Sequence, residues 1–145
     1  MKRKTSRGFL IVFVAFLVLS ILCVGGCTSS SSQTKSDFFN AGNANMSVTG
    51  AQFDQYTLFR FDTSTSAHTM AFPSATDIVN NLSSPYVGEV ISFAVAADGS
   101  NNVTLIAGTN VTITLNAQTV AENTTLTMYC ELDNITSGSD AVTIY

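Results

Sequence analysis

The hydrophobic residues of this chain follow two different patterns. Residues 9–24 read FLIVFVAFLVLSILCV, an almost unbroken apolar run, whereas from Phe38 onward short apolar runs alternate with polar residues. Residues 28–37 lie between these regions, are rich in Ser and Thr, and show no apolar periodicity, which is typical of a flexible tether. We therefore expect a membrane anchor or lipoprotein signal over residues 1–27, a tether over 28–37 and one folded domain over 38–145.

Alternation with a period of two predicts β-strands throughout the domain. From Val111 to Leu115 the apolar residues fall on one face of the strand and the threonines on the other, and the run from Thr125 to Leu132 alternates in the same way. Turns rich in Gly, Asn, Asp and Ser separate the runs. The strands expected on this basis cover Met46–Thr49, Tyr56–Phe61, His68–Phe72, Glu89–Ala96, Val103–Ile106, Val111–Leu115, Thr125–Leu132 and Ala141–Tyr145.

One helix is expected near the middle of the domain. Ser74 can cap its start, and Asp77 stands near the positive end of the helix dipole. Ile78, Val79 and Leu82 supply an apolar stripe, and Pro85 limits how far the helix can extend. Many short strands with one short helix indicate an all-β fold. We expect a small, jelly-roll-like β-sandwich of about eight strands, preceded by an N-terminal transmembrane or signal helix.

Basic residues stand before the apolar run, at Lys2, Arg3, Lys4 and Arg7. This bias holds the N-terminus on the cytoplasmic side, so the domain is expected on the non-cytoplasmic side of a membrane.

Two interpretations of the end of the anchor remain open. The sequence VGGC at 24–27 resembles a bacterial lipobox, in which the cysteine is lipidated and becomes the new N-terminus, and a Ser-rich segment typically follows. Cys27 would then be the lipidated residue. Alternatively, Gly25, Gly26 and Cys27 end an uncleaved transmembrane helix, because an apolar run of about 16 residues is longer than most signal cores and near the lower limit for spanning a bilayer.

The charge of the domain bears on nucleic-acid binding, and its cysteine content bears on disulfide formation. Residues 28–145 contain two basic and ten acidic residues, a formal charge of −8. Such a domain cannot neutralise phosphates, so we expect no nucleic acid as a partner. Because Cys23 and Cys27 belong to the anchor, Cys130 is alone in the domain; it lies on the apolar phase of its strand and is expected to be a buried small hydrophobe rather than an intermolecular thiol.

From about Met70 the order of segments is FPSATDIVNNL, SPYVGEVISFAVA, NNVTLIAGTNVTI and NITSGSDAVTIY. This order resembles a short β domain of virion structural proteins from large DNA viruses and some tailed phages. The matching positions are Pro73, Ile78, Val87, Gly88, Phe93, Val103, Thr104, Leu105, Gly108, Val111, Ser137, Gly138, Ala141, Val142, Thr143, Ile144 and Tyr145.

The resemblance implies a minor capsid or fibre-type virion protein that works by packing and contact, with no catalytic motif to transfer. Its partners would be other structural subunits, capsid proteins or copies of itself. The chain differs from the usual arrangement because a single copy of the domain follows a membrane segment. In a virus with an internal membrane, this suggests a protein tied to the bilayer beneath the shell; in a cellular genome it suggests a surface protein.

Six N-x-S/T sequons are candidate glycosylation sites on loops, should the domain pass through a eukaryotic secretory route. A domain this rich in Asn, Ser and Thr also produces sequons by chance, so both interpretations remain. The sequons begin at Asn45, Asn81, Asn102, Asn110, Asn123 and Asn134.

Side chains that could carry catalysis are few. His68 is the only histidine and is expected on an exposed strand face, so no histidine pair is available for a metal. The turn from Asp98 to Asn101 has oxygen ligands but lacks the spaced acidic set of a calcium loop, which favours a solvated hairpin turn. Arg60 should point away from Phe59 and Phe61, towards solvent. We expect no enzyme, no metal site and no cofactor.

Two functional hypotheses follow. The first is a membrane-tethered structural protein that packs against neighbouring subunits, and it predicts exposed apolar surface on the isolated domain. The second is a surface lipoprotein that acts as a binding or adhesion module, and it predicts a processed N-terminus with a lipidated Cys27.

Overall fold

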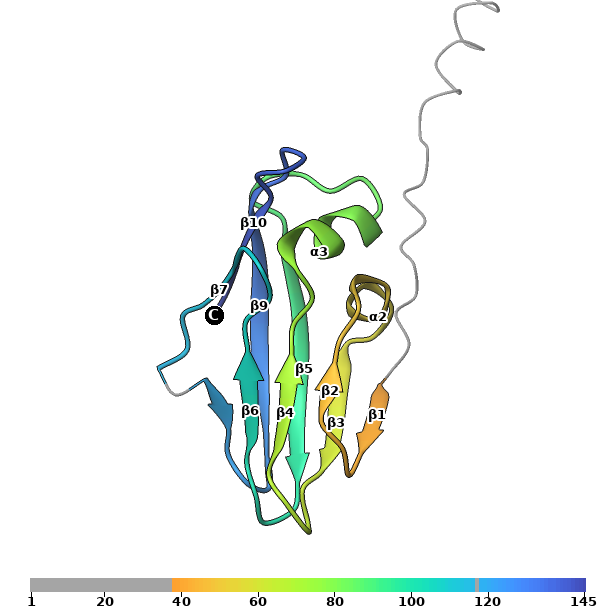
Figure 1. Ribbon diagram of the computed structural model, residues 1–145, viewed down its shortest axis with the longest axis vertical. Coiled ribbons are helices and arrows are strands. Elements are labelled where there is room, and N and C mark those ends of the chain that lie inside the picture. Colours follow the sequence, from red (N-terminus) through yellow and green to blue (C-terminus); the bar gives the residue numbers. More distant parts are fainter. Residues whose placement is uncertain (1–37, 117) are drawn as a thin grey trace, which may run out of the picture. The chain divides into compact units, whose positions relative to one another are not determined.

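The computed structural model describes residues 38–116 and 118–145, and over these residues the protein is a mostly β domain with two short helices. Six strands form one mixed sheet in the order β1-β3-β5-β9-β10-β7, and four form a second in the order β2-β4-β6-β8. Figure 1 shows the two sheets face to face, with both helices at one end. The predicted anchor (1–27) and tether (28–37) lie outside the described residues.

The elements have the following bounds. The six-stranded sheet consists of β1 (Phe39–Gly42), β3 (Leu58–Asp62), β5 (Val90–Asp98), β9 (Thr124–Asn134), β10 (Ala141–Ile144) and β7 (Val111–Ile113). The four-stranded sheet consists of β2 (Met46–Ser47), β4 (His68–Ala71), β6 (Val103–Ile106) and β8 (Thr119–Val120). The helices are α2 (Gly50–Gln55) and α3 (Ala75–Asn81).

Up to β9 the chain changes sheets at every step, and this explains why most neighbouring strands are parallel. From β1 to β6, each crossing reverses the chain direction, so every second strand returns to its first sheet in its first direction. Accordingly β1, β3 and β5 pair in parallel, as do β2, β4 and β6. The jelly-roll-like arrangement was therefore a wrong prediction, because a jelly roll is built from antiparallel neighbours.

The two ends of the sandwich are built differently. At one end, four arches cross between the sheets: residues 43–45, 63–67, 99–102 and 121–123. At the other end, α2 connects β2 to β3 and α3 connects β4 to β5 (Figure 1). The two helices lie close together, because a Cβ on Gly50 would stand 2.2 Å from the backbone oxygen of Asp77. Glycine at position 50 is what permits this approach.

Both helices begin at a capped residue. In α3 the Ser74 hydroxyl accepts a hydrogen bond from the backbone N–H of Asp77 at 3.1 Å, which confirms the predicted start. In α2, Thr49 and Gln52 form a capping box. The pattern T-x-x-Q could have revealed α2 from the sequence, but six residues are too few to show an apolar stripe.

All eight predicted strands are present, and two further strands, β1 and β8, join them. One core cluster draws on both sheets and both helices. Cys130 is buried within it, as predicted.

An aromatic cluster joins the helical end to the six-stranded sheet. The ring of Phe93 on β5 lies 5.0 Å from that of Phe53 on α2 and 5.6 Å from that of Phe72, which follows β4, both in edge-on geometry. All three side chains are buried. The cluster therefore ties together elements from distant parts of the chain.

Replacement of Phe93 by alanine should lower the free energy of unfolding by about 3–5 kcal/mol, because it leaves a cavity and removes the two ring contacts. The neighbouring Ser92 points to the opposite, exposed face, so Ser92→Ala should change stability by no more than about 0.5 kcal/mol. Urea unfolding followed by circular dichroism measures both values; equal effects would contradict this account of the core.

Candidate functional site

The arches are held together by polar side chains, of which His68 is buried and the asparagines are half-buried or exposed. His68 is only 5% exposed, and its Nε2 lies 2.7 Å from the Asn43 Oδ1 and 3.1 Å from the backbone oxygen of Asp62. Since both neighbours are acceptors, Nε2 carries the proton and donates. The ring also stacks on Phe61. The expected exposed position of His68 was therefore wrong: the residue is on the same phase of β4 as the buried Met70 and satisfies its polar atom internally.

Asparagine side chains link each arch to its neighbour. The Asn43 amide donates to the Thr65 hydroxyl at 2.6 Å, and the Asn101 amide donates to the backbone oxygen of Thr63 at 2.8 Å. The Asn45 Oδ1 accepts from the backbone N–H of Thr69 at 2.9 Å. These bonds explain the abundance of asparagine in the turns as a structural requirement of stacked arches.

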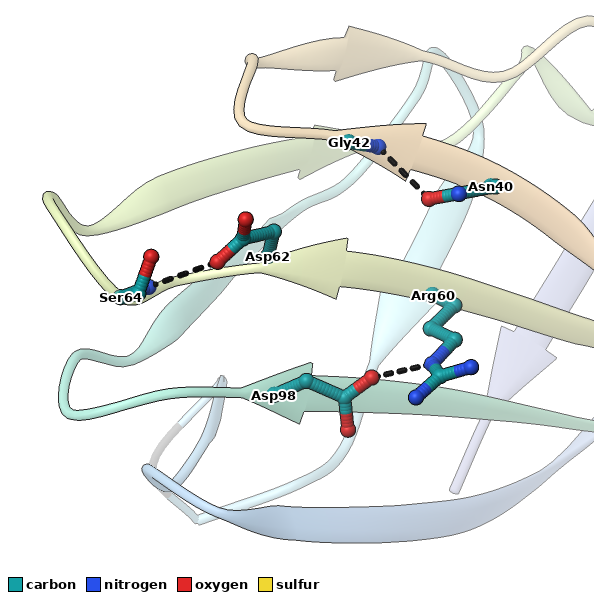
Figure 2. A network of polar contacts seen from close by, with 6 residues as sticks. All are labelled: Asn40, Gly42, Arg60, Asp62, Ser64 and Asp98. Carbon is teal, nitrogen blue, oxygen red and sulfur yellow. Dashed lines mark hydrogen bonds and ion pairs between the residues drawn. The ribbon is translucent and has the colours of Figure 1, made fainter.

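Charged side chains of the six-stranded sheet gather on its outer face near the arches. Figure 2 shows Arg60 on β3 paired with Asp98 on β5, and Asp62 turned towards Ser64. As predicted, Arg60 is exposed while Phe59 and Phe61 are buried. Because both partners of the Arg60 ion pair are exposed, the pair contributes at most about 1 kcal/mol to stability.

The pKa of the Asp62 carboxyl is lowered by hydrogen bonds within its own turn. Hydrogen bonds from the Ser64 hydroxyl and from the Ser64 backbone N–H hold the pKa of the Asp62 carboxyl below its ordinary 3.8. Slight desolvation opposes this shift, and the nearby His68 adds a smaller lowering of the pKa. The carboxylate is thus part of the arch rather than a poised acid or base.

The turn from Asp98 to Asn101 is not the hairpin expected from the sequence. It connects β5 in one sheet to β6 in the other and is therefore an arch. A Cβ on Gly99 would stand 2.4 Å from the backbone nitrogen of Ser64, so the arches are in close contact. Among residues 38–116 and 118–145, no group of three or more His, Cys, Asp or Glu side chains could hold a metal ion.

One acidic residue has a structural role that the sequence did not indicate. Asp140 is buried just before β10, and its Oδ2 accepts a hydrogen bond from the Thr76 hydroxyl of α3 at 2.8 Å. The bond joins residues 64 positions apart. No local pattern marks such a contact, because only the fold brings the two segments together.

Large apolar side chains lie exposed on the outer face of the six-stranded sheet and on the turn beside it. Tyr129 on β9 and Tyr145 after β10 are 43% and 42% exposed, and their rings stack 5.9 Å apart. Val90 on β5 is opposite Glu131, two residues from Tyr129 on the same face. We call this set of residues the Tyr–Val patch; its members are Tyr86, Val87, Val90, Tyr129 and Tyr145.

The turn that carries Tyr86 and Val87 is fixed beside the end of β9, since the N–H of Gly88 donates to the backbone oxygen of Leu132 at 2.8 Å. Glu131 and Asp133 are on the same outer face of β9 as Tyr129. The patch is thus apolar and aromatic with an acidic border, which makes it the strongest candidate for a contact surface on the described domain.

The predicted sequons are spread over the domain rather than gathered in one place. Asn45, Asn81, Asn102 and Asn134 all hydrogen-bond through their side chains to nearby backbone groups. Asn110 and Asn123 are exposed and adopt positive φ angles of 58° and 51°. Of the six, these two positions place the asparagine on a turn without a described side-chain hydrogen bond. Whether any is glycosylated stays a prediction.

Cys27, the candidate lipidation site, lies outside the described residues. Within residues 38–116 and 118–145, no helix has the length and apolar character needed to cross a membrane. No protein-family model, no curated protein and no solved structure matches the chain.

The buried hydroxyl of Thr63 is the one fully buried side-chain polar atom of the described domain without a hydrogen-bond partner. Thr63→Val should therefore raise the free energy of unfolding by about 1–3 kcal/mol, since the shape is kept and the orphan hydroxyl removed. Thr65→Val is the matched control and should lower stability, because the Thr65 hydroxyl accepts from Asn43. A destabilised Thr63→Val protein would contradict this interpretation of the arch.

Ser64→Ala should raise the pKa of Asp62 towards 3.8, because the serine hydroxyl is the largest cause of its lowering. A carboxyl with a lowered folded-state pKa stabilises the fold above its unfolded-state pKa and loses this effect as the pH falls through the folded-state value. The stability difference between wild type and Ser64→Ala should therefore be full at neutral pH and shrink below pH 3.8. NMR titration of the Asp62 carboxyl carbon measures the pKa, and Ser66→Ala should leave it unchanged.

Proposed function

We propose that the protein is a non-enzymatic structural component, fixed to a membrane by its N-terminal segment, whose domain packs against other protein subunits on the non-cytoplasmic side. In a virion it acts as a minor capsid protein between the membrane and the protein shell. The proposal combines the sequence resemblance with one observation on the domain, the Tyr–Val patch.

The patch supports a contact function because exposed tyrosines favour protein interfaces. Tyrosine presents a large, rigid, partly apolar surface whose hydroxyl remains hydrogen-bonded when the ring is covered. The stacked Tyr129 and Tyr145 stand on neighbouring strands, so they form one fixed surface rather than two mobile side chains. Burial of such a surface by a partner provides affinity at a low cost in conformational entropy.

The acidic border of the patch indicates the kind of subunit that would cover it. Glu131 and Asp133 flank the patch, and the described residues contain nine acidic residues against the single Arg60. A partner with basic residues around an apolar centre would complement both features, and opposite charges would also accelerate the encounter.

The alternative is a surface lipoprotein that acts as a binding or adhesion module. The VGGC sequence at 24–27 and the Ser-rich residues that follow favour it. Both proposals use the same patch but differ in the N-terminus. Intact-mass measurement of the native protein separates them: loss of residues 1–26 with acyl chains on Cys27 supports the lipoprotein, and a full-length mass supports the uncleaved anchor.

The full-length protein carrying Tyr129→Ser and Tyr145→Ser should enter particles purified from the native source about tenfold less efficiently than wild type at equal membrane levels. Ile106→Ser is the matched control, because Ile106 is similarly exposed on the other sheet. Quantitative mass spectrometry of gradient-purified particles gives the incorporated amount. Equal incorporation of all three proteins would overturn the patch as the contact, and particles that lack the wild-type protein would favour the lipoprotein alternative.

A further inference from the structure

The long strand β9 extends well past its neighbour on one side. β5 pairs with β9 from Thr124 to Glu131, whereas β10 pairs with β9 only from Cys130 to Asn134, and Tyr145 reaches Tyr129. Residues 124–128 therefore have β5 on one side and no strand of the described domain on the other. Figure 1 shows β9 running on past the end of β10 towards the arches.

The backbone groups of Thr125 and Thr127 face this open edge. Tyr129 exchanges hydrogen bonds with Tyr145, at 2.8 and 3.0 Å, so its N–H and C=O point away from β5. Residues two and four positions earlier point the same way, because strand geometry alternates with a period of two. Ala94, the partner of Thr127 on β5, independently supports this: it donates to the backbone oxygen of Thr57 on the far side.

The side chains of the edge also indicate that something covers it. Leu126 shares the inward phase of β9 with Met128, Cys130 and Leu132, which are completely buried, yet Leu126 is only partly buried. Leu126 lies in the part of β9 that has no β10 beside it. The edge sequence TTLTM contains no charge and no proline, the features by which exposed edges usually avoid pairing, and Thr favours strands.

We infer that residues 124–128 pair with the same residues of a second copy of this chain, antiparallel and around a two-fold axis at Leu126. In that arrangement Thr125 of each copy exchanges backbone hydrogen bonds with Thr127 of the other, and the two Leu126 side chains meet on the inward face. The edge is self-complementary, because a two-fold axis places like residues together and none of these residues is charged.

The negative charge of the domain should make this pairing depend on the salt concentration. Residues 38–145 carry nine acidic residues and one arginine, so two copies repel each other at a distance while the edge itself is neutral. Self-association should therefore strengthen as salt screens the repulsion. A shared membrane would favour it further by raising the effective concentration of the domains.

The experiment uses the full chain in detergent and measures its mass by light scattering at several protein concentrations, in about 0.05 and 0.5 M salt, where the Debye length is near 14 and 4 Å. Wild type should form dimers, more readily at high salt. Thr127→Pro removes the N–H that faces the open edge and is not used in pairing with β5, so dimers should weaken at least about tenfold. Thr127→Val keeps the N–H and the shape and should dimerise like wild type.

Two further measurements keep the test decisive. Thr127→Lys leaves the backbone intact but places a charge on the edge, so it decides the question should Thr127→Pro fail to fold by circular dichroism. Hydrogen exchange of the Thr125 and Thr127 amides should slow as concentration rises. A wild-type protein that stays monomeric, or dimers that persist in Thr127→Lys and in folded Thr127→Pro, would overturn the inference. The inference is independent of the proposed function, since a monomer could still bind an unlike subunit through the Tyr–Val patch.

Discussion

The pairing of β5 with β9 organises both the six-stranded sheet and the core. These are the two longest strands, and they pair antiparallel from Val90 to Ala97. On one side of this pair are β3 and β1, from the part of the chain whose strands alternate between the two sheets. On the other side, β10 and β7 complete the six-stranded sheet. The inner faces of the pair contribute Phe93, Met128 and Cys130 to the core. The outer faces carry Val90 and Tyr129, so one ladder determines both the core and the main exposed surface.

The polar side chains of the arches form hydrogen bonds within the domain itself. Arches that cross between two sheets bring backbone groups into partly buried positions, where they need hydrogen-bond partners. Asn101 and His68 supply such partners to the backbone oxygens of Thr63 and Asp62. Asn43 connects His68 to Thr65, and the close approach at Gly99 keeps the arches stacked. These asparagines and the histidine therefore stabilise the turns. The aromatic and apolar residues of the outer face, by contrast, remain exposed.

Because the strands of the six-stranded sheet differ in length, the sheet exposes two different surfaces, a face and an edge. Where β10 covers β9, the paired strands present stacked tyrosines on a flat face. Where β10 ends, the backbone of β9 presents unpaired donors and acceptors at an edge. The face depends on side-chain chemistry and an acidic border, whereas the edge depends on backbone hydrogen bonding. Under the two proposals made above, an unlike subunit would cover the face and a second copy would pair with the edge.

Local patterns in the sequence encode the eight main strands, the capped helix after Ser74, the buried Cys130 and the outward direction of Arg60. These follow from alternation and capping, which act over a few residues. The order of the strands is visible only in the folded domain, because alternation specifies a buried face but not the neighbouring strand. The fold alone joined Asp140 to Thr76 and left the Tyr–Val patch and half of β9 uncovered, whereas the buried position of His68 agrees with the alternation that it shares with Met70.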